Sequence, residues 1–479
     1  PNDQQVEALN NIAEFISKGF DTTSKDITDN MYTLMGYAGT GKTSITKILL
    51  EYLRKRNISN DVTATTHKAK GVLSNAISRR TKTIHNVLAL APNIDPTQVD
   101  LEKLNMSIVA DGAFPTDVLI IDESSFIGPD LFDFIKQRAE KNQQQVIFIG
   151  DPAQLKPVTE EDDDTVILEK ENSPVFKEIT NKSELTQVER QAGDNPLGPI
   201  LDSIRNNMKS EFPTFGYKSE IIGNQGIVFT NSGTQFSKDI VKAFQSDSFK
   251  TNRNFVRAIT YTNKRVTKLN EAIRKGLGYS EPYVVGEILM GYDNYNKNRQ
   301  GVYSINNSVD YIVTNVEYVE SKNVGEKALR DAGLNLQPMV MSGYNITLQD
   351  ISDSKIKPVE VFILDNSNSE EQFKELGRQS EALAALGHKN RSLFKHWYDF
   401  MNSFALNRKV QGDKVDPKTG KLRTVLKKTL DYGYAHTIHK SQGSTYTNIF
   451  VDLDTVDIST DAEERNQMKT RRKEVTQDW

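Results

Sequence analysis

The stretch GYAGTGKT, from Gly36 to Thr43, constrains the fold of this chain more than any other. It follows the apolar run YTLM and precedes an amphipathic run that is typical of a helix. In this context the spacing G-x-x-x-x-G-K-[ST] predicts a P-loop, in which backbone N–H groups and a helix N-terminus surround phosphate oxygens. A chance glycine-rich turn is the alternative, and the strand-like and helix-like flanks argue against it.

The P-loop assigns a role to each of its residues. We expect Lys42 to place a positive charge at the β- and γ-phosphates, and Thr43 to offer its hydroxyl to Mg²⁺. The other nucleotide-binding positions of the loop are Gly36, Gly39, Thr40 and Gly41.

Two later apolar runs also end in side chains that suit phosphate chemistry. LIIDESS delivers Asp122 and Glu123, and IGDPAQLKPV delivers Gln154. We expect Asp122 to hold Mg²⁺, Glu123 to activate the attacking water and Gln154 to contact the γ-phosphate or that water. For Gln154 alone, a polar loop with a purely structural role remains open. Because strands alternate with helices here, the sequence predicts a parallel sheet with these residues at one edge.

The nucleotide is expected to be ATP. The guanine-reading pattern Asn-Lys-x-Asp is absent, and the nearest match after an apolar run, at Asn263, lacks the acid. Gln4 or Gln5, ahead of the first strand, could read adenine with an amide donor and acceptor.

A second α/β unit begins near residue 225. From about residue 283 short β segments between turn residues predict a small barrel or sheet inserted into that unit. Helices are expected at 369–386 and 391–406, and α/β character returns after residue 429. The second helix places a stripe of side chains that we expect to pack in a core: Leu393, Trp397, Met401 and Phe404.

Composition limits the class of protein. The chain has no cysteine, which excludes disulfides and thiolate zinc sites. A net charge of −4 argues against one broad basic face for duplex DNA, but a narrow channel for a single strand needs only local positive charge. There is neither a run of about 20 apolar residues nor the pattern of a signal peptide at the first residues. We therefore expect a cytoplasmic protein of a bacterial or phage-infected cell.

Eight motifs occur in the order seen in superfamily 1 DNA helicases: GYAGTGKT, ATTHKAKGVL, TKTIHNVL, LIIDESS, GDPAQLKPV, TQVERQ, AITYTNKRVTKLN and HTIHKSQGST. Over residues 2–300 and 390–473 the chain resembles the branch that contains RecD and the Dda helicases. The resemblance implies ATP-driven movement along single-stranded DNA in the 5′ to 3′ direction.

The resemblance also implies a domain organisation. Residues 1–185 would form a first RecA-like domain, and 186–300 with 426–479 a second one. Residues 301–425 would form an inserted SH3-like β-barrel with a helical arm. The first domain would carry a hairpin insertion at 88–116, a pin that splits the duplex with Phe114 or Met106 at its tip.

The same resemblance implies roles at the nucleotide. Gln5 is similar to the glutamine that reads adenine, and Gln442 and Gly443 lie in the motif that touches nucleotide. Arg190 is similar to the arginine that reaches the γ-phosphate from the second domain. Arg471, with Arg472 as the alternative, is similar to the arginine finger, although the apolar residues of that motif do not precede it.

For DNA, the resemblance implies contacts from both domains. The first-domain positions are Thr66, His67, Thr83 and His85, and those of the second are Asn263, Thr437, His439 and Lys440. Small hydroxyls and imidazole N–H groups bind phosphates without reading bases. For each histidine a structural role stays open.

We therefore expect a monomeric ATP- and Mg²⁺-dependent helicase that acts on single-stranded and forked DNA by a two-domain inchworm. A translocase that displaces proteins without processive unwinding is one alternative. A non-catalytic scaffold is a second, and a metabolic P-loop kinase a third, weaker one. A role in replication, recombination or repair, and partners from those processes, stay open.

Overall fold

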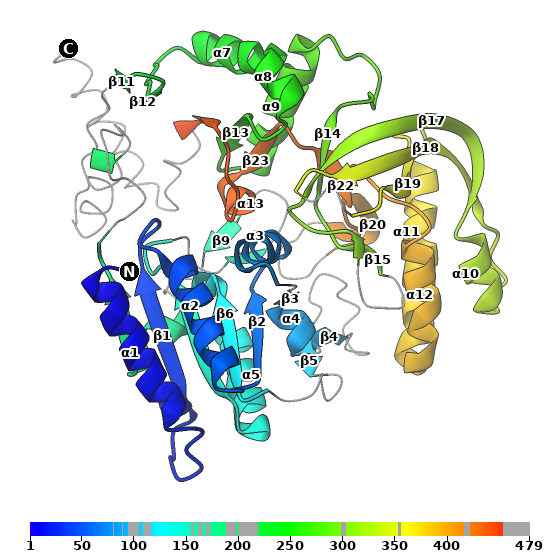
Figure 1. Ribbon diagram of the computed structural model, residues 1–479. Coiled ribbons are helices and arrows are strands. Elements are labelled where there is room, and N and C mark those ends of the chain that lie inside the picture. The colour runs from blue at the N-terminus through cyan, green and yellow to red at the C-terminus, as the bar shows by residue number, and fades with distance from the viewer. Residues whose placement is uncertain are drawn as a thin grey trace. The chain divides into compact units, whose positions relative to one another are not determined.

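The computed structural model describes these residues: 1–79, 81–88, 90–93, 105–108, 116–154, 158–160, 166–168, 173–187, 198–199, 219–297, 303–352, 356–415 and 422–453. The chain forms two compact units (Figure 1). The first runs from Pro1 to Phe236 apart from two short segments, and the second is essentially Ser237–Trp479.

The first unit is built on a six-stranded parallel sheet with the order β10-β1-β7-β6-β2-β3. Its strands are β1 (Met31–Gly36), β2 (Asn60–Ala64), β3 (Lys82–Thr83), β6 (Val118–Asp122), β7 (Gln145–Gly150) and β10 (Lys182–Leu185). The predicted α/β fold with a parallel sheet is confirmed.

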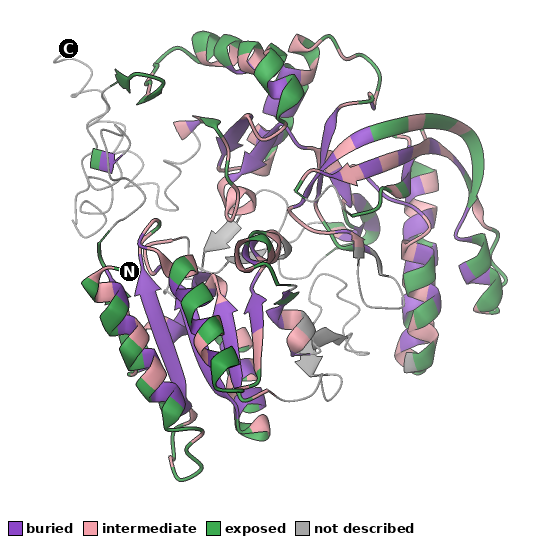
Figure 2. Cartoon of the chain, viewed as in Figure 1, coloured by how far each residue is buried: buried purple, intermediate pink, exposed green. Residues whose placement is uncertain are grey.

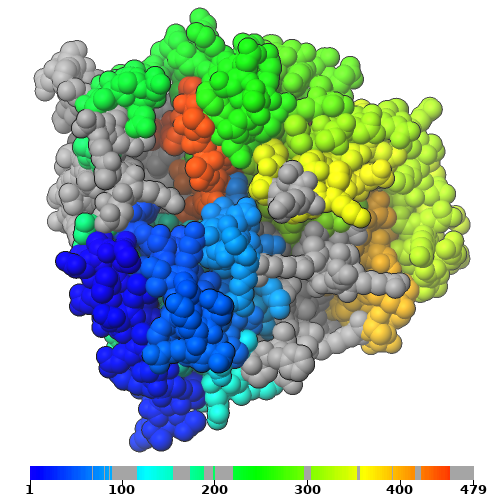
Figure 3. Space-filling view, viewed as in Figure 1, coloured from blue at the N-terminus to red at the C-terminus, as the bar shows by residue number. Residues whose placement is uncertain are grey.

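Helices cover both faces of this sheet. The helices α1 (Asp3–Ser17), α2 (Lys42–Lys55) and α3 (His67–Ile77) pack on one face, and α4 (Ile84–Val87) and α5 (Pro129–Asn142) on the other. In β6, Val118 and Ile120 join the first core whereas Leu119 and Ile121 join the second, so the strand is buried on both sides (Figure 2). The outer surfaces of α1 and α2 are blue in Figure 3. Only the edges of such a sheet remain open for a ligand.

Short elements complete the first unit. They are η1 (Ile27–Asn30), η2 (Ser124–Phe126), η3 (Pro174–Phe176) and the hairpins β4–β5 (Leu90–Asn93, Asn105–Ile108), β8–β9 (Val158–Glu160, Val166–Leu168) and β11–β12 (Glu220–Ile222, Gln225–Ile227). The strands β4 and β5 fall within the segment 88–116 in which a hairpin was predicted. Its role as a pin stays a prediction.

The second unit contains a parallel sheet with the order β23-β13-β24. Its strands are β13 (Val256–Thr260), β23 (Ala435–Thr437) and β24 (Asn448–Val451). The helices of this part are α7 (Gly233–Gln245), α8 (Asp247–Thr251), α9 (Asn263–Gly276) and α13 (Ile438–Ser441).

An antiparallel sheet with the order β19-β18-β17-β14-β22 lies between β13 and β23 in the sequence. Its strands are β14 (Ile288–Gly291), β17 (Asp310–Val324), β18 (Met339–Asp350), β19 (Val359–Leu364) and β22 (Leu430–Tyr432). Two hairpins accompany it: β15–β16 (Tyr295–Lys297, Tyr303–Ile305) and β20–β21 (Val410–Val415, Leu422–Leu426). The predicted inserted β region is therefore a sheet, and its likeness to an SH3 barrel stays a prediction.

Three helices share a core with this inserted sheet, and a short turn of 3₁₀ helix lies between the last two of them in the sequence. They are α10 (Glu326–Asp331), α11 (Glu370–Lys389), η4 (Arg391–Leu393) and α12 (Phe394–Met401). The expected helix at 391–406 is too long, because the helix ends at Met401 and Phe404 lies beyond it. Trp397, Met401 and Phe404 pack in this core as predicted.

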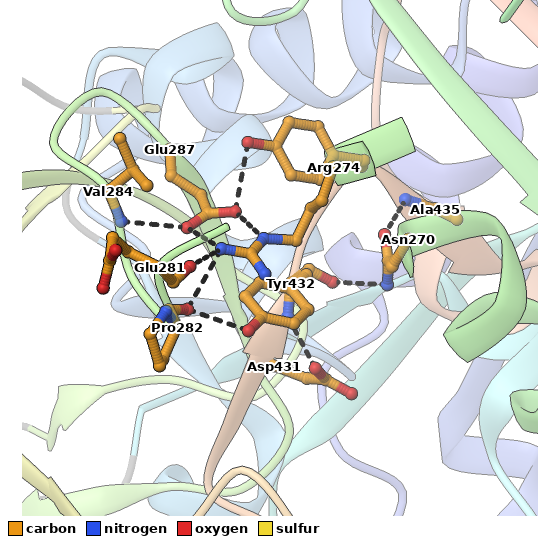
Figure 4. Close-up of polar contacts among 10 residues, drawn as sticks. Asn270, Arg274, Glu281, Pro282, Val284, Glu287, Asp431, Tyr432 and Ala435 are labelled. Atoms are coloured by element: carbon orange, nitrogen blue, oxygen red, sulfur yellow. Dashed lines mark hydrogen bonds and ion pairs between the residues drawn. The ribbon is translucent and has the colours of Figure 1, made fainter. Parts of the chain in front are cut away.

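A buried ion pair fastens the inserted sheet to α9 (Figure 4). The Arg274 side chain donates to Glu287, which is fully buried just before β14, and its guanidinium lies 4.1 Å from the centre of the Tyr432 ring in β22. Asn270 donates to the Tyr432 carbonyl and accepts from the N–H of Ala435.

None of the helices in the described part of the chain combines the length and the apolar composition that a membrane-spanning helix requires.

Candidate functional site

Three neighbouring strands of the first unit bring the predicted catalytic segments to one edge. The order β1-β7-β6 makes these strands neighbours, and all run in the same direction. The P-loop follows β1, Gln154 follows β7, and Asp122 and Glu123 stand at the end of β6. The C-terminal edge of a parallel sheet is the place where such folds bind ligands.

The P-loop needs its glycines for steric reasons. Gly39 and Gly41 have φ of 88° and 86°, in the left-handed region that other residues avoid. A Cβ on Gly36 would lie 2.6 Å from Thr40 Oγ1, and one on Gly41 would lie 2.4 Å from Gln5 Nε2. The loop is therefore closely packed by its own residues and by α1.

Gln5 is the glutamine that touches the P-loop. Its Nε2 donates to the Thr40 carbonyl at 3.0 Å, and its Oε1 accepts from the N–H of Asn2 at 3.1 Å within a capping box. Gln4 instead pairs with Thr186, donating from Nε2 at 2.9 Å and accepting from its N–H at 3.0 Å. Adenine reading by Gln5 stays a prediction, and the structure gives Gln5 a second role as a support of the loop.

Lys42 lies folded over the P-loop. Its Nζ donates to the carbonyls of Gly36 at 2.6 Å and Tyr37 at 3.0 Å. Thr43 is half-buried in the first turn of α2. Both are the residue types that P-loop chemistry places at phosphate and Mg²⁺.

The pKa values of the two carboxyls at the end of β6, those of Asp122 and Glu123, are both raised. Burial raises the pKa of Asp122, while the N–H of Glu123 (2.9 Å) and the charge of Lys42 oppose that rise. Burial first, and then the charge of Asp122, raise the pKa of Glu123 to about 7. Glu123 has φ 54°, a strained conformation for this residue type and one that is often found at functional sites. The half-buried carboxyls of Asp122 and Glu123 and the Thr43 hydroxyl are hard oxygen ligands, so these residues fit Mg²⁺.

Gln154 is connected to the same edge. Its Oε1 accepts from Ser125 Oγ at 3.3 Å, two residues beyond Glu123. The backbone between β7 and Gln154 is shaped by Asp151, which is buried and accepts from the N–H of Ala153 at 2.9 Å. The structure thus joins the β6 and β7 motifs by a direct side-chain contact.

The predicted DNA contacts of the first unit lie after β2 and β3. Thr66 caps α3, because its Oγ1 accepts from the N–H of Ala69 at 3.1 Å. Thr83 is buried at the end of β3, and burial lowers the pKa of His85 in α4. His67 begins α3, and its side chain lies outside the described set.

The predicted contacts of the second unit also share a sheet edge. Because β13 and β23 are parallel neighbours, Asn263 at the start of α9 and Thr437 at the end of β23 lie at the same edge. Thr437 caps α13, and burial lowers the pKa of His439, whose ring centre lies 6.1 Å from that of Tyr261. Lys440 donates from Nζ to Asn307 Oδ1 at 2.7 Å.

Gln442 and Gly443 follow α13. Gln442 is its C-terminal cap, and Gly443 has φ 72°. Their contact with nucleotide stays a prediction.

The sequence profile of the AAA domain family matches residues 22–215. An uncharacterized protein of Acanthamoeba polyphaga mimivirus is 24% identical, covering 94% of this chain and 93% of that protein. The ATP-dependent DNA helicase dda of Enterobacteria phage T4 is 28% identical, covering 59% of this chain and 61% of the relative. The ATP-dependent RecD2 DNA helicase of Deinococcus radiodurans is 28% identical, covering 39% and 23%. The chain spans less than two thirds of either helicase.

The chain is similar to the RecD/Dda-like branch of superfamily 1 helicases. The predicted resemblance is therefore confirmed, and the predicted link with bacteriophage fits the phage and viral relatives. The individual roles given above to residues of this RecD/Dda-like chain stay predictions.

Several predicted residues lie outside the described part of the chain. These are Arg190, Arg471, Arg472 and Phe114. Met106 lies in β5, and its side chain is not described.

Some contacts of this RecD/Dda-like chain were not expected from the sequence. Thr65 donates from Oγ1 to the Glu123 carbonyl at 3.2 Å, Ser125 binds Gln154, and Asn307 binds Lys440. Thr65 and Ser125 flank predicted motif residues, which is a signal that could have found them. Asn307 is 133 residues from its partner, and no local pattern marks it.

Proposed function

We propose that this chain is an ATP-dependent DNA helicase that moves 5′ to 3′ on single-stranded DNA and separates duplex DNA. The predicted enzyme class, an ATP-driven DNA helicase, is supported by the similarity of the chain to the phage T4 dda and Deinococcus RecD2 helicases. One observation carries the proposal. Three adjacent parallel strands, β1, β7 and β6, bring the P-loop, Gln154 and the Asp122–Glu123 pair to the same edge of the sheet. The direction of movement is supported by the branch alone.

In the proposed hydrolysis, each residue acts on the γ-phosphate or on the water. Lys42 leaves the loop carbonyls to hold the phosphates, and Glu123 accepts a proton from the attacking water. Thr43 and Asp122 would hold Mg²⁺, which supplies positive charge to the phosphate oxygens when it is bound. Gln154 orients the water or senses the γ-phosphate.

We propose that two arginines complete the site from the second RecA-like domain. Arg190 and Arg471, with Arg472 as the alternative, would meet charge that develops on the γ-phosphate in the transition state. Gln442 and Gly443 would link this change to DNA. Family motifs support these assignments.

DNA binding is proposed at the sheet edges that carry the capping threonines. Thr66 and Thr437 accept from a helix N–H, which leaves their hydroxyl hydrogens able to point toward a phosphate. His67, Thr83 and His85 would add first-domain contacts, and Asn263, His439 and Lys440 second-domain contacts. ATP would shift the two domains between states by binding one state more tightly, which gives an inchworm cycle.

The finer organisation is also proposed. The domains would divide at 1–185, 186–300 with 426–479, and 301–425, where the inserted sheet forms an SH3-like barrel with a helical arm. The segment 88–116 would act as the pin. The chain would act as a monomer in the cytoplasm of a bacterial or phage-infected cell.

The proposal is tested by ATP hydrolysis with and without single-stranded DNA. We expect DNA to stimulate hydrolysis by the wild type, and Lys42→Ala to abolish it. Lys47→Ala is the matched control, because Lys47 is exposed on the same helix. Equal activity in Lys42→Ala and wild type would favour the scaffold, and hydrolysis that requires a small acceptor rather than DNA would favour the kinase.

A further inference from the structure

The loop before β17 touches the HTIHKSQG motif directly. Asn307 Oδ1 accepts from Lys440 Nζ at 2.7 Å, and the same Nζ lies 4.5 Å from the centre of the Tyr292 ring. Asn307 is itself held, because its N–H donates to Asn294 Oδ1 at 3.0 Å. Lys440 is therefore fixed by two residues of the inserted region.

A second, buried contact lies at the other end of this loop. Asp310, the first residue of β17, accepts from Arg257 in β13 at 3.2 Å and lies 3.1 Å from His436 Nε2 in β23. Arg257 and His436 are fully buried, and the Tyr446 hydroxyl lies 3.3 Å from His436 Nδ1. His436, the first residue of the HTIHKSQGST motif, and Tyr446, which directly follows the motif, thus belong to one network with the inserted sheet.

These contacts join parts that are already fastened elsewhere. Arg274, Glu287 and Asn270 bind α9 to the segments before β14 and around β22 (Figure 4). Separating a buried ion pair such as Arg274–Glu287 would leave each charge uncompensated, so these contacts are costly to break. A loop held to the parallel sheet in this way can set the geometry of the motif next to it.

We propose that Asn307 and Asp310 are positioning residues, through which the inserted sheet holds the Thr437–Gly443 segment in the geometry that binds a DNA phosphate. The inference rests on the proposed function, because it assigns Lys440 to DNA. A lysine side chain loses much conformational freedom when it is fixed. An ammonium group that is already fixed before DNA arrives loses less of that freedom on binding.

The first measurement is independent of DNA. Hydrogen–deuterium exchange of peptides that cover residues 434–446 is compared in wild type, Asn307→Ala, Asn307→Asp and Asn315→Ala. Asn307→Asp keeps a side-chain oxygen acceptor, and Asn315 is an exposed asparagine of β17 that serves as control. We expect faster exchange of the Thr437–Gly443 amides in Asn307→Ala only. Unchanged exchange in that variant would overturn the positioning role.

The second measurement is the concentration of single-stranded DNA that gives half-maximal ATP hydrolysis. We expect Asn307→Ala to raise it about threefold to tenfold, which is about 0.7 to 1.4 kcal/mol at 1.4 kcal/mol per factor of ten, with hydrolysis at saturating DNA unchanged. Asn307→Asp should restore the wild-type value. An unchanged or lower concentration in Asn307→Ala would overturn the proposal, the lower value because Asn307 would then compete with DNA for Lys440.

The two measurements separate the two claims. If the wild type shows no DNA-stimulated hydrolysis, the proposed function fails, and the exchange experiment still decides whether Asn307 positions the motif. Asp310→Asn is a harsher variant, because it leaves Arg257 and His436 without their carboxylate. In an Asp310→Asn variant that keeps the wild-type circular dichroism spectrum, exchange of the Thr437–Gly443 amides should also be faster, and unchanged exchange would overturn the role given to Asp310.

Discussion

Replacing Gly41 by alanine should destabilise the first unit through Gln5. Gly41 has φ 86°, and a Cβ there would lie 2.4 Å from Gln5 Nε2. A non-glycine residue in the left-handed region costs about 1–2 kcal/mol. The Gln5 amide would also have to move, which would break its bonds with the Thr40 carbonyl and the Asn2 N–H.

The size of the effect depends on whether Gln5 is present. Each of the two hydrogen bonds contributes about 0.5–1.5 kcal/mol, so Gly41→Ala should cost about 2–5 kcal/mol in total. In a Gln5→Ala background the side chain is already gone, and the same substitution should cost only the backbone term of about 1–2 kcal/mol. The double-mutant cycle should therefore give a coupling of about 1–3 kcal/mol between the two sites.

Native-state hydrogen exchange of the slowest amides in β1 reads the stability of the first unit alone. Gly19→Ala is a suitable control, since Gly19 also has positive φ (68°) but a Cβ there would meet nothing within 4 Å. If Gly41→Ala costs the same free energy with and without Gln5, the steric argument is wrong. ATP binding should weaken in Gly41→Ala for the same reason.

Two further predictions follow from buried charge. Glu123→Gln should leave ATP binding intact and lower the rate of hydrolysis by about 10²–10⁴-fold, because it removes the general base. A rate within twofold of wild type in a single-turnover assay would contradict this prediction. Glu140→Gln, on the exposed side of α5, is the control. Arg274→Ala should destabilise the second unit by about 3–5 kcal/mol, because Glu287 is left buried and unpaired. Urea unfolding followed by the fluorescence of Trp397 measures it, since Trp397 packs against the core of the inserted sheet in that unit. A loss of less than about 1 kcal/mol in the free energy of unfolding would mean that the Arg274–Glu287 ion pair is exposed to solvent.

The sequence predicts the nucleotide edge of the first unit well, because each segment carries its own local signal. The strands YTLM, LIID and QVIFIG are continuous apolar runs, as expected for strands buried on both faces. The glycines of the P-loop mark positive φ at Gly39 and Gly41. These signals are local, so reading them needs no knowledge of distant contacts.

The inserted region shows where the sequence is insufficient. Its strands are recognisable one by one, but the order β19-β18-β17-β14-β22 depends on pairing across long loops. The contact between Lys440 and Asn307 arises from this pairing, and so does the network of Asp310 with Arg257 and His436. The helix at 391–406 was predicted too long because its apolar spacing continues to Phe404, although the helix ends at Met401.

The central claim is tested most directly by strand displacement on duplexes that carry a single-stranded tail at either the 5′ or the 3′ end. With ATP and Mg²⁺ we expect the wild type to separate the 5′-tailed duplex and not the 3′-tailed one, and Lys42→Ala to separate neither. Stimulated ATP hydrolysis without displacement from either tail would favour a translocase. Displacement from the 3′ tail only would contradict the proposed direction, and displacement by Lys42→Ala at the wild-type rate would contradict the claim that ATP hydrolysis at this P-loop drives unwinding.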